Sequence, residues 1–509
     1  MSEGRVKKSS RNISVGLIAT VINTITAFIG RKAFVVFLGS DALGINGLFT
    51  EVIAILSLTE LGVGMAIVYN LYKPLSDHDE QKISQLMSLY RTAYNIIAVV
   101  ILVLGLAITP VVHKLITEVN YPLSYIRLIF ILFVIKTSSS YLFSYKTSLL
   151  NADQKQYVVS FVTMVGKAVF TVVSIIVLWM TKNYIIYLIL TIIQTILTNI
   201  VLSFYVDKHY PYLDYSQHLS EEERNKVFDD VKNLFLKKVS GGITNSTDNI
   251  LISKLVSTIQ SGLYSNYVLV FSGVRTLRIA FTNGLAASIG ELSVSEEVEK
   301  CIQVLRRLTY IYYLFAIVAS SVLFAVCDHF IEFCFGNVYV MEKMVVVIAT
   351  FVLYLEICSD PLWQYLEVSG LFKQDKYIGL AGSVINLIVS IVLGLKIGIS
   401  GIFIGTVCTQ LVQLILKTNL LFREKYHVPS TSYYLMWIKL LASFILLCLV
   451  KQFILDPIII ENLFLAILVK GIVGLIIGIL FSVIPFYGTE EFSYSISLFT
   501  SFVQRSRKS

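Results

Sequence analysis

The sequence predicts an all-α integral membrane protein that crosses the bilayer about fourteen times. Of its 509 residues, 56% are hydrophobic and only 15% are charged, and the mean hydropathy is +0.76. The apolar residues form continuous blocks of about twenty, the length that spans a hydrocarbon core of about 30 Å. Such blocks must be helical, because lipid offers no partners to backbone N–H and C=O groups. Their continuous, non-alternating pattern excludes a β-barrel.

The apolar blocks define the expected spans in order along the chain. They cover residues 13–38, 45–69, 92–112, 123–149, 157–180, 184–206, 234–256, 262–289, 308–326, 345–368, 377–395, 400–422, 434–453 and 463–484. The first block is too long and too polar for a cleavable signal peptide, and no small-residue cleavage site follows it. We therefore expect it to be a permanent helix.

Basic residues are concentrated in every second connection between these spans. The rich connections include Arg11, Arg91, Lys155, Lys238, Arg307, Lys376, Arg423 and Arg505, and the poor ones carry single residues such as Lys114, Lys182, Lys343 and Lys396. This alternation follows the positive-inside rule and predicts a multi-pass protein with both termini in the cytoplasm. It also accounts for the net charge of +8 without a nucleic-acid partner.

The chain is predicted to contain one six-helix unit twice, in the same orientation. Three short segments of the first half match the second half at a shift of about 218 residues, among them Gly44 with Gly262 and Arg91 with Arg307. Parallel repeats are a common plan of transporters, with the substrate site between the halves. The expected parts are an N-terminal lobe (1–206), a cytoplasmic linker (207–233), a C-terminal lobe (234–422), two additional helices (423–486) and a cytoplasmic tail (487–509).

Polar residues at helical spacing identify the helix faces that avoid lipid. The first, second, fourth, seventh and eighth spans each carry such a row, including Asn23, Asn245 and Asn249. Small polar residues also join helices to one another by hydrogen bonds. The Ser and Thr rows therefore leave a structural role and a cavity-lining role equally open.

Charged residues within the spans decide between these two roles. Each costs roughly 2.5–3.5 kcal/mol at the bilayer centre, so a chain that holds many needs ion pairs or a wet cavity. We expect Arg31, Lys136, Arg275 and Arg278 to bind substrate, and Glu60, Asp248, Glu356 and Asp360 to act in gating or coupling. Arg31 or Lys32 could instead form a structural ion pair with Glu51, and Glu60 with Arg278 could close the inner mouth.

The residue types also limit the chemistry of the cavity. Arg and Lys outnumber acidic residues on the cavity helices, which suits an anion, and Arg matches the geometry of phosphate oxygens. The six histidines lie in or near loops and the six cysteines are scattered, so a histidine proton relay, a disulfide framework and a zinc site are not expected. No Walker-type phosphate loop is present. We expect no catalytic residue, no metal and no cofactor.

Four passages carry a resemblance to a known family. They are LGINGLF at 43–49, ELGVG at 60–64, LLNADQK at 149–155 and FCFG with Tyr339 at 333–339. Together with the layout of six, six and two helices, the chain resembles the polysaccharide flippases of the multidrug/oligosaccharidyl-lipid/polysaccharide exporter superfamily. The resemblance implies a cationic central cavity in which undecaprenyl-diphosphate-linked oligosaccharide units cross to the outer leaflet by alternating access. It also implies that Arg31, Arg275 and Arg278 hold the diphosphate.

The resemblance further implies a bacterial cytoplasmic membrane, a lipid-linked oligosaccharide and membrane lipid as binding partners, and contact with polymerase and glycosyltransferase machinery. An ion-coupled drug or organic-cation antiporter of the same superfamily remains an alternative, because Glu60, Asp248, Glu356 and Asp360 could bind cations. A membrane polysaccharide polymerase or ligase is less favoured, since every outer connection is short.

Overall fold

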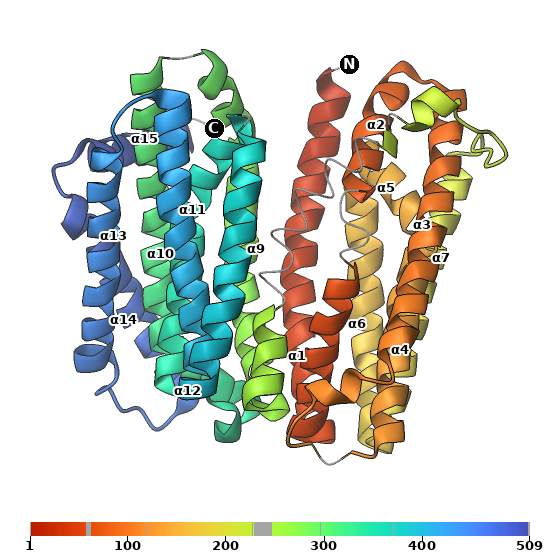
Figure 1. Cartoon of the computed structure of the whole chain (residues 1–509), viewed down its shortest axis with the longest axis horizontal. Helices are drawn as coiled ribbons and strands as arrows, with labels where there is room; N and C mark the ends of the chain where they lie inside the picture. The colour runs from red at the N-terminus through yellow and green to blue at the C-terminus, as the bar shows by residue number, and fades with distance from the viewer. Residues whose placement is uncertain are drawn as a thin grey trace. The chain divides into compact units, whose positions relative to one another are not determined.

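The computed structural model is built from helices, and its described residues contain no β-strand. It describes residues 2–57, 63–119, 121–225, 227–228, 247–295, 297–369 and 371–506. The chain divides into two compact units, unit 1 (Met1–Gly262) and unit 2 (Leu263–Ser509), whose helices are labelled in Figure 1.

Unit 1 is a bundle of long helices joined by short turns. Its elements are α1 (Ser2–Leu56), α2 (Val63–Asp77), α3 (Glu80–Ile108), η2 (Val112–Leu115), α4 (Leu123–Tyr141), α5 (Ser144–Ala152), α6 (Gln156–Thr181), α7 (Tyr184–His209) and the π-helical turn η3 (Ile252–Val256). The helix α9 (Thr258–Ser295) begins in unit 1 and continues into unit 2.

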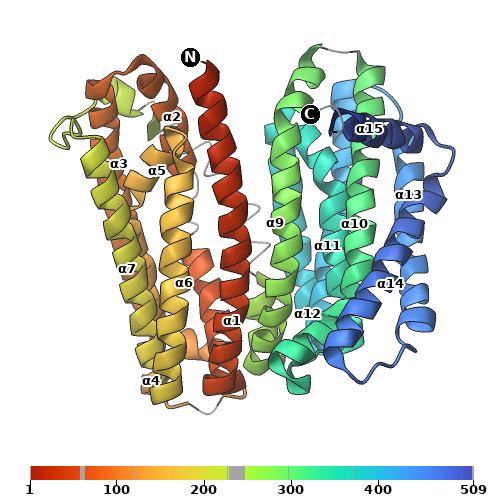
Figure 2. The ribbon, with the colours of Figure 1, turned by 180° about the vertical axis from the view of Figure 1, so that it is seen from behind.

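Unit 2 contains the remaining helices. They are α10 (Val298–Phe335), η4 (Asn337–Tyr339), α11 (Lys343–Val368), α12 (Phe372–Leu420), η5 (Leu421–Tyr426), α13 (Thr431–Val450), η6 (Lys451–Leu455), α14 (Leu463–Val483), η7 (Ile484–Phe486) and α15 (Glu490–Ser506). Figure 2 shows α15 lying crosswise to the long helices of this unit, at the end where α10 begins. The predicted cytoplasmic tail thus contains a helix that the sequence pattern does not predict.

The structure confirms a polytopic helical membrane protein. In the described part of the chain, ten helices are long and apolar enough to cross a bilayer. Two of them are each two helices joined at a break, at Gly39 in α1 (φ 80°) and at Ile397–Gly398 in α12 (φ 63° at Gly398). The predicted seventh span lies largely outside the described residues, so the count of fourteen and the lobe boundaries stay predictions.

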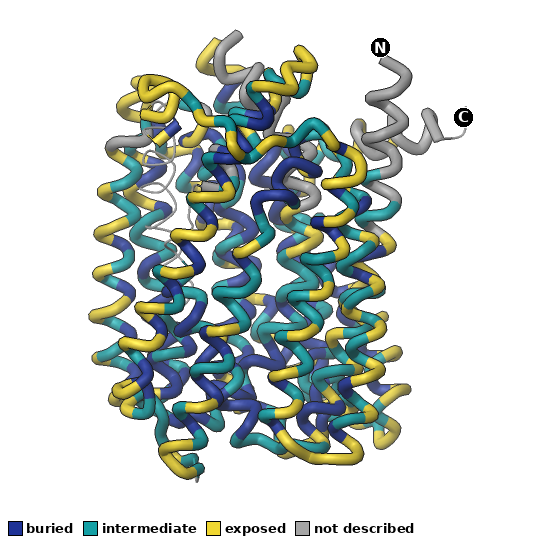
Figure 3. Tube along the Cα trace, turned by 90° about the vertical axis from the view of Figure 1, so that its right-hand side faces the viewer, coloured by how far each residue is buried: buried dark blue, intermediate teal, exposed yellow. Residues whose placement is uncertain are grey.

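Short polar side chains start several helices at the positions that helix-capping preferences favour. The Asn183 side chain accepts hydrogen bonds from the amides of Ile185 and Ile186 at the start of α7. Asn462 caps α14 in the same way, by accepting from the amide of Leu465 at 3.0 Å. Along the helices, exposed and buried positions alternate (Figure 3), as expected where one face packs and the other meets lipid.

The segment that follows α7 packs against α3 in unit 1. The hydroxyls of Ser84 and Ser88 on α3 donate to the carbonyls of Tyr212 and Tyr215, at 3.1 and 2.8 Å. The ammonium of Lys146 on α5 binds Asp207 at 2.7 Å. Residues 207–225, which the sequence assigns to a linker, therefore pack onto unit 1.

The core of unit 2 is aromatic. Tyr310 and Tyr313 of α10 lie against Phe486, with ring centroids 4.7 and 5.3 Å away. Tyr354 of α11 contacts Phe444 of α13 at 4.8 Å, and its hydroxyl donates to the carbonyl of Leu440. The hydroxyls of Tyr310 and Tyr313 also donate to backbone carbonyls, so these three buried phenols are all hydrogen-bonded.

Candidate functional site

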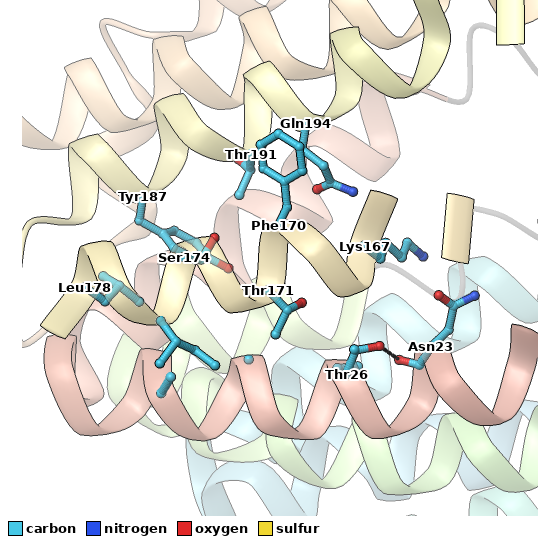
Figure 4. Close-up of a pocket in the computed structure, with 14 residues that line it drawn as sticks. Asn23, Thr26, Lys167, Phe170, Thr171, Ser174, Leu178, Tyr187, Thr191 and Gln194 are labelled. Atoms are coloured by element: carbon cyan, nitrogen blue, oxygen red, sulfur yellow. Dashed lines mark hydrogen bonds between the residues drawn. The ribbon is translucent and has the colours of Figure 1, made fainter. Parts of the chain in front are cut away.

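Unit 1 contains a pocket between α1, α6 and α7, with a volume of about 200 Å³ and both polar and apolar lining residues. Its walls carry Asn23, Thr26, Gly30, Lys167, Thr171, Ser174, Tyr187, Thr191 and Gln194. Figure 4 shows Asn23 rising from α1 on the side where the Lys167 side chain extends from α6. The Oδ1 of Asn23 is buried and has no hydrogen-bond partner in the described part of the chain. The pocket therefore offers one unused hydrogen-bond acceptor, the Oδ1 of Asn23.

One lysine, Lys167, lines this pocket, and a second, Lys136, lies outside its lining but close enough to interact with Lys167 electrostatically. Lys167 is the single charged residue of α6 and lies near its middle, while Lys136 lies on α4. Their like charges act on one another electrostatically. Within the described residues, neither ammonium forms an ion pair with a carboxylate. We call these two residues the lysine site.

The first arginine candidate lies on α1, one residue beyond the pocket-lining Gly30. The Arg31 side chain interacts electrostatically with Tyr184 and Tyr187 of α7, and Tyr187 also lines the pocket. The ring of Phe34, one turn further along α1, packs edge-on against the same two tyrosines at 5.3 and 5.2 Å. The structure thus brings Arg31 to the end of the pocket wall formed by α7.

Asn249 and Glu51 form a second polar contact in unit 1. The amide of Asn249, which is 7% exposed, donates to the carboxylate of Glu51 at 3.1 Å. Glu51 therefore has a partner that the sequence reading did not anticipate. Asp248 is half-buried beside Asn249, whereas Glu60 and Asn245 lie outside the described residues.

In unit 2, α9 and α11 bring two arginines and two carboxylates together. The Nε of Arg275 lies 3.0 Å from Oε2 of Glu356, and Nη1 of Arg278 lies 3.0 Å from Oε1 of Glu356. Arg278 also approaches Oδ1 of Asp360 at 3.6 Å. The four side chains are 16–32% exposed. We call them the ion-pair cluster.

Helical spacing explains why the sequence forms this cluster. Arg275 and Arg278 are three residues apart on α9, and Glu356 and Asp360 are four apart on α11, so each pair occupies one helix face. The two positive and two negative charges compensate one another. The predicted excess of basic over acidic residues therefore does not hold within this cluster.

The described residues contain no group of three or more His, Cys, Asp or Glu side chains placed to hold a metal ion. The lysine site instead offers two ammonium groups, which donate hydrogen bonds. The ion-pair cluster offers two guanidinium groups that are paired with carboxylates. Such groups bind anionic or polar ligands by charge-assisted hydrogen bonds.

Comparison with solved structures identifies the fold. The lipid II flippase MurJ in an inward closed conformation is similar over 92% of this chain and 98% of its own, with a TM-score of 0.67 and 14% identity. An inward-facing multidrug resistance MATE family transporter of the MOP superfamily matches 78% of this chain and 92% of its own, with a TM-score of 0.58 and 15% identity. The Vibrio cholerae MATE transporter VcmN is similar over 82% of this chain and 99% of its own, with a TM-score of 0.57 and 14% identity.

At the sequence level, no curated protein matches the chain. A family model described as polysaccharide biosynthesis protein matches residues 35–341, which is more than half of the chain. This stretch includes both residues of the lysine site, Lys136 and Lys167, and the two arginines of the ion-pair cluster. The chain is a multi-pass membrane protein with the fold of MOP-superfamily transporters, and it belongs to the polysaccharide biosynthesis protein family.

Proposed function

We propose that this protein is a flippase of the bacterial cytoplasmic membrane. Its substrate would be an undecaprenyl-diphosphate-linked oligosaccharide repeat unit, moved from the cytoplasmic to the outer leaflet by alternating access. The product serves the biosynthesis of a capsule, exopolysaccharide or O-antigen-type polysaccharide. The family match and the likeness to the lipid II flippase support this class of substrate.

The observation that carries the proposal is the lysine site. A lysine at bilayer depth costs roughly 2.5–3.5 kcal/mol on insertion scales, and here two of them act on one another with no described carboxylate in an ion pair with either. An anionic headgroup entering the bundle would compensate both charges at once. A diphosphate supplies several oxygens that accept hydrogen bonds from ammonium groups.

The polar residues around Lys167 suit the remainder of such a headgroup. Asn23, Thr191 and Gln194 line the same pocket, and side-chain amides and hydroxyls both donate and accept hydrogen bonds. Sugar hydroxyls need such mixed partners. We assign Asn23 to this role, together with Asn245 and Asn249 from the sequence reading.

The ion-pair cluster has a different role in the proposal. Arg275 and Arg278 are held by Glu356 and Asp360, and a diphosphate offers the same charge to the same guanidinium groups. Substrate and carboxylates would then compete for the arginines, which couples substrate arrival to release of the α9–α11 contact. Glu60 and Asp248 remain candidates for gating.

The test uses the purified chain in liposomes with a fluorescent polyprenyl-diphosphate-linked oligosaccharide as the probe. Movement between leaflets is followed by chemical quenching of the fluorophore in the outer leaflet. We expect the double variant Lys136→Met/Lys167→Met to translocate the probe at least tenfold more slowly, a loss of about 1.4 kcal/mol or more in barrier terms.

Lys396→Met is the matched control, because this lysine is exposed on α12 and belongs to neither site. It should translocate at the wild-type rate. Wild-type activity of the double variant would reject the role of the lysine site. Transport of an organic cation, with no movement of the diphosphate probe, would instead favour the antiporter, in which Glu60, Asp248, Glu356 and Asp360 are the candidate cation ligands.

A further inference from the structure

The helix α14 carries one charged residue in an otherwise apolar sequence. Its mean hydropathy of 2.7 is the highest of the candidate spans in the described chain, yet Lys470 lies seven residues after its start at Leu463. The Lys470 side chain is nearly buried, with 5% of the residue exposed. An ionisable residue at this depth in a span is costly, so it is retained for a contact or a function.

Small residues fix the middle of α14 against α10. A Cβ at Gly474 would lie 2.8 Å from Cβ of Ala325, and one at Gly478 would lie 2.8 Å from Cα of Val318. The hydroxyl of Ser321 donates to the carbonyl of Gly474 at 2.7 Å. This close approach of two helix backbones is typical of small-residue helix pairs in membranes.

Two tyrosines fix the far end of α14. Tyr310 donates to the carbonyl of Ser482 at 3.0 Å, and Tyr313 donates to that of Phe481 at 2.6 Å. Phenols keep their protons below about pH 10. The contacts from Gly474 to Ser482 are therefore insensitive to changes in pH near neutrality.

The near end of α14 is held in a different way. The ammonium of Lys470 lies 3.2 Å from Nε2 of His329 on α10. Because an ammonium only donates, the imidazole must accept at Nε2, which it does only in its neutral form. This contact therefore depends on a group that ordinarily titrates near pH 6.5.

The contact faces a pocket of about 600 Å³ between α10, α14 and the adjoining turns. The charged groups that act on His329 or Lys470 there are Asp328, Glu332, Lys343, Lys451 and Asp456, and Glu342 and Glu461 also line the pocket. Protons can thus reach His329 through a polar, charged opening. The distribution of basic residues in the sequence predicts that this end of the bundle lies on the outer side of the membrane.

Most of these neighbours already have partners. Lys343 and Lys451 bind Asp456 at 3.2 and 2.9 Å, and Asp328 accepts from the hydroxyl of Tyr267 at 2.9 Å. Burial opposes the ionisation of Asp456, but the hydrogen bond and charge of Lys451, with those of Lys343, hold the pKa of this carboxyl below its ordinary value. Asp456 therefore stays charged and paired while His329 changes state.

We propose that Lys470 and His329 form a proton-operated latch that releases the near end of α14 from α10 when the pocket becomes acidic. A proton added at Nε2 of His329 removes the acceptor and leaves two positive charges about 3 Å apart. The Gly474–Ser482 region stays fixed, so the expected motion is confined to the first turns of α14. This inference is independent of the proposed substrate.

The test measures how readily a thiol at the latch reacts. Ala466 is fully buried one turn before Lys470, so Ala466→Cys reports opening of this end of α14. The variant is placed in lipid nanodiscs and labelled with a maleimide at pH 7.5 and pH 5.5, and the rate from the six native cysteines is subtracted. The same thiol is measured in a His329→Gln background, which cancels the pH dependence of thiol chemistry.

Glutamine can accept the hydrogen bond from Lys470 but does not titrate in this range. We expect equal rates in the two backgrounds at pH 7.5, and at pH 5.5 at least threefold faster labelling when His329 is intact than in the His329→Gln background. Lys470→Met should also abolish the acid response, because it removes the repelled charge. His113→Gln, in unit 1, should retain it.

Equal rates in both backgrounds at pH 5.5 would overturn the latch, as would a full acid response in Lys470→Met. Thermal melting of variants without the added cysteine gives a second measurement. The wild-type melting temperature should fall more between pH 7.5 and 5.5 than that of His329→Gln, and an identical fall would also overturn the proposal.

Discussion

Two clusters of positive charge, the lysine site in unit 1 and the ion-pair cluster in unit 2, differ in how their charges are compensated. In unit 2, Arg275 and Arg278 lie within 3.0 Å of carboxylate oxygens. In unit 1, Lys136 and Lys167 form no ion pair with a described carboxylate. Attraction within an ion pair offsets part of the free energy needed to remove a charge from water. A cation within the bilayer that has no carboxylate beside it lacks this compensation. Under the proposed function, the contrast separates charges that contribute to folding from charges that a ligand compensates.

The largest effect is expected from removing the acid that two arginines share. Glu356→Gln removes the carboxylate that Arg275 and Arg278 share, while Asp360 still lies 3.6 Å from Arg278. Because loss of one partner strands a partly buried charge, the free energy of unfolding should fall by about 3 kcal/mol. Thermal melting of the purified protein measures this loss. Unchanged stability would mean that the cluster does not hold α9 to α11.

A smaller loss is expected for a paired lysine in unit 1. The ammonium of Lys146 donates to Ser203 at 2.6 Å and to Asp207 at 2.7 Å, and the residue is 6% exposed. Lys146→Met should lower the free energy of unfolding by about 2 kcal/mol, since charge-assisted hydrogen bonds are lost. If this variant melted like the wild type, pairing would not be what distinguishes the lysines of unit 1.

The smallest effect should have the opposite sign. Lys136→Met removes a cation that repels Lys167 and belongs to no ion pair with a described carboxylate, so the free energy of unfolding should rise by about 1 kcal/mol, a fraction of the insertion cost. The same melting experiment detects it, and Lys396→Met is the neutral reference. A lower melting temperature for Lys136→Met would show that this lysine stabilises the fold.

Much of the fold could be predicted because the spans depend on composition alone. Blocks of about twenty apolar residues predict a helix wherever they occur, and α6 and α7 lie within a few residues of their predicted bounds. The predicted gaps between apolar blocks coincide with the backbone breaks at Gly39 and Gly398. At each break the two helices follow one another without an intervening loop. The packing of residues 207–225 onto unit 1 was missed, because hydrogen bonds from Ser84 and Ser88 to backbone carbonyls leave no pattern in the sequence.

The sequence identifies the residues of the ion-pair cluster but not which of them contact one another. The sequence singles out Arg275, Arg278, Glu356 and Asp360 as costly charges at depth, but it places α9 and α11 some 80 residues apart with nothing to indicate that they pair. Lys470 was overlooked, although a single lysine in a very apolar block was a usable signal. His329, which the sequence places in or near a loop, lies on α10, six residues before that helix ends at Phe335.

The contact between α15 and α10 bears on how the chain enters the membrane. Arg306 and Arg307 end up bound to Glu491 and Glu490, at 2.6 and 2.5 Å. These arginines are among the basic residues expected to fix orientation during insertion, yet their acidic partners are translated more than 180 residues later, about 10–40 s at ordinary rates. The salt bridges between α10 and α15 can therefore form only after α15 has been synthesised, and Arg306 and Arg307 lack these two carboxylate partners until then.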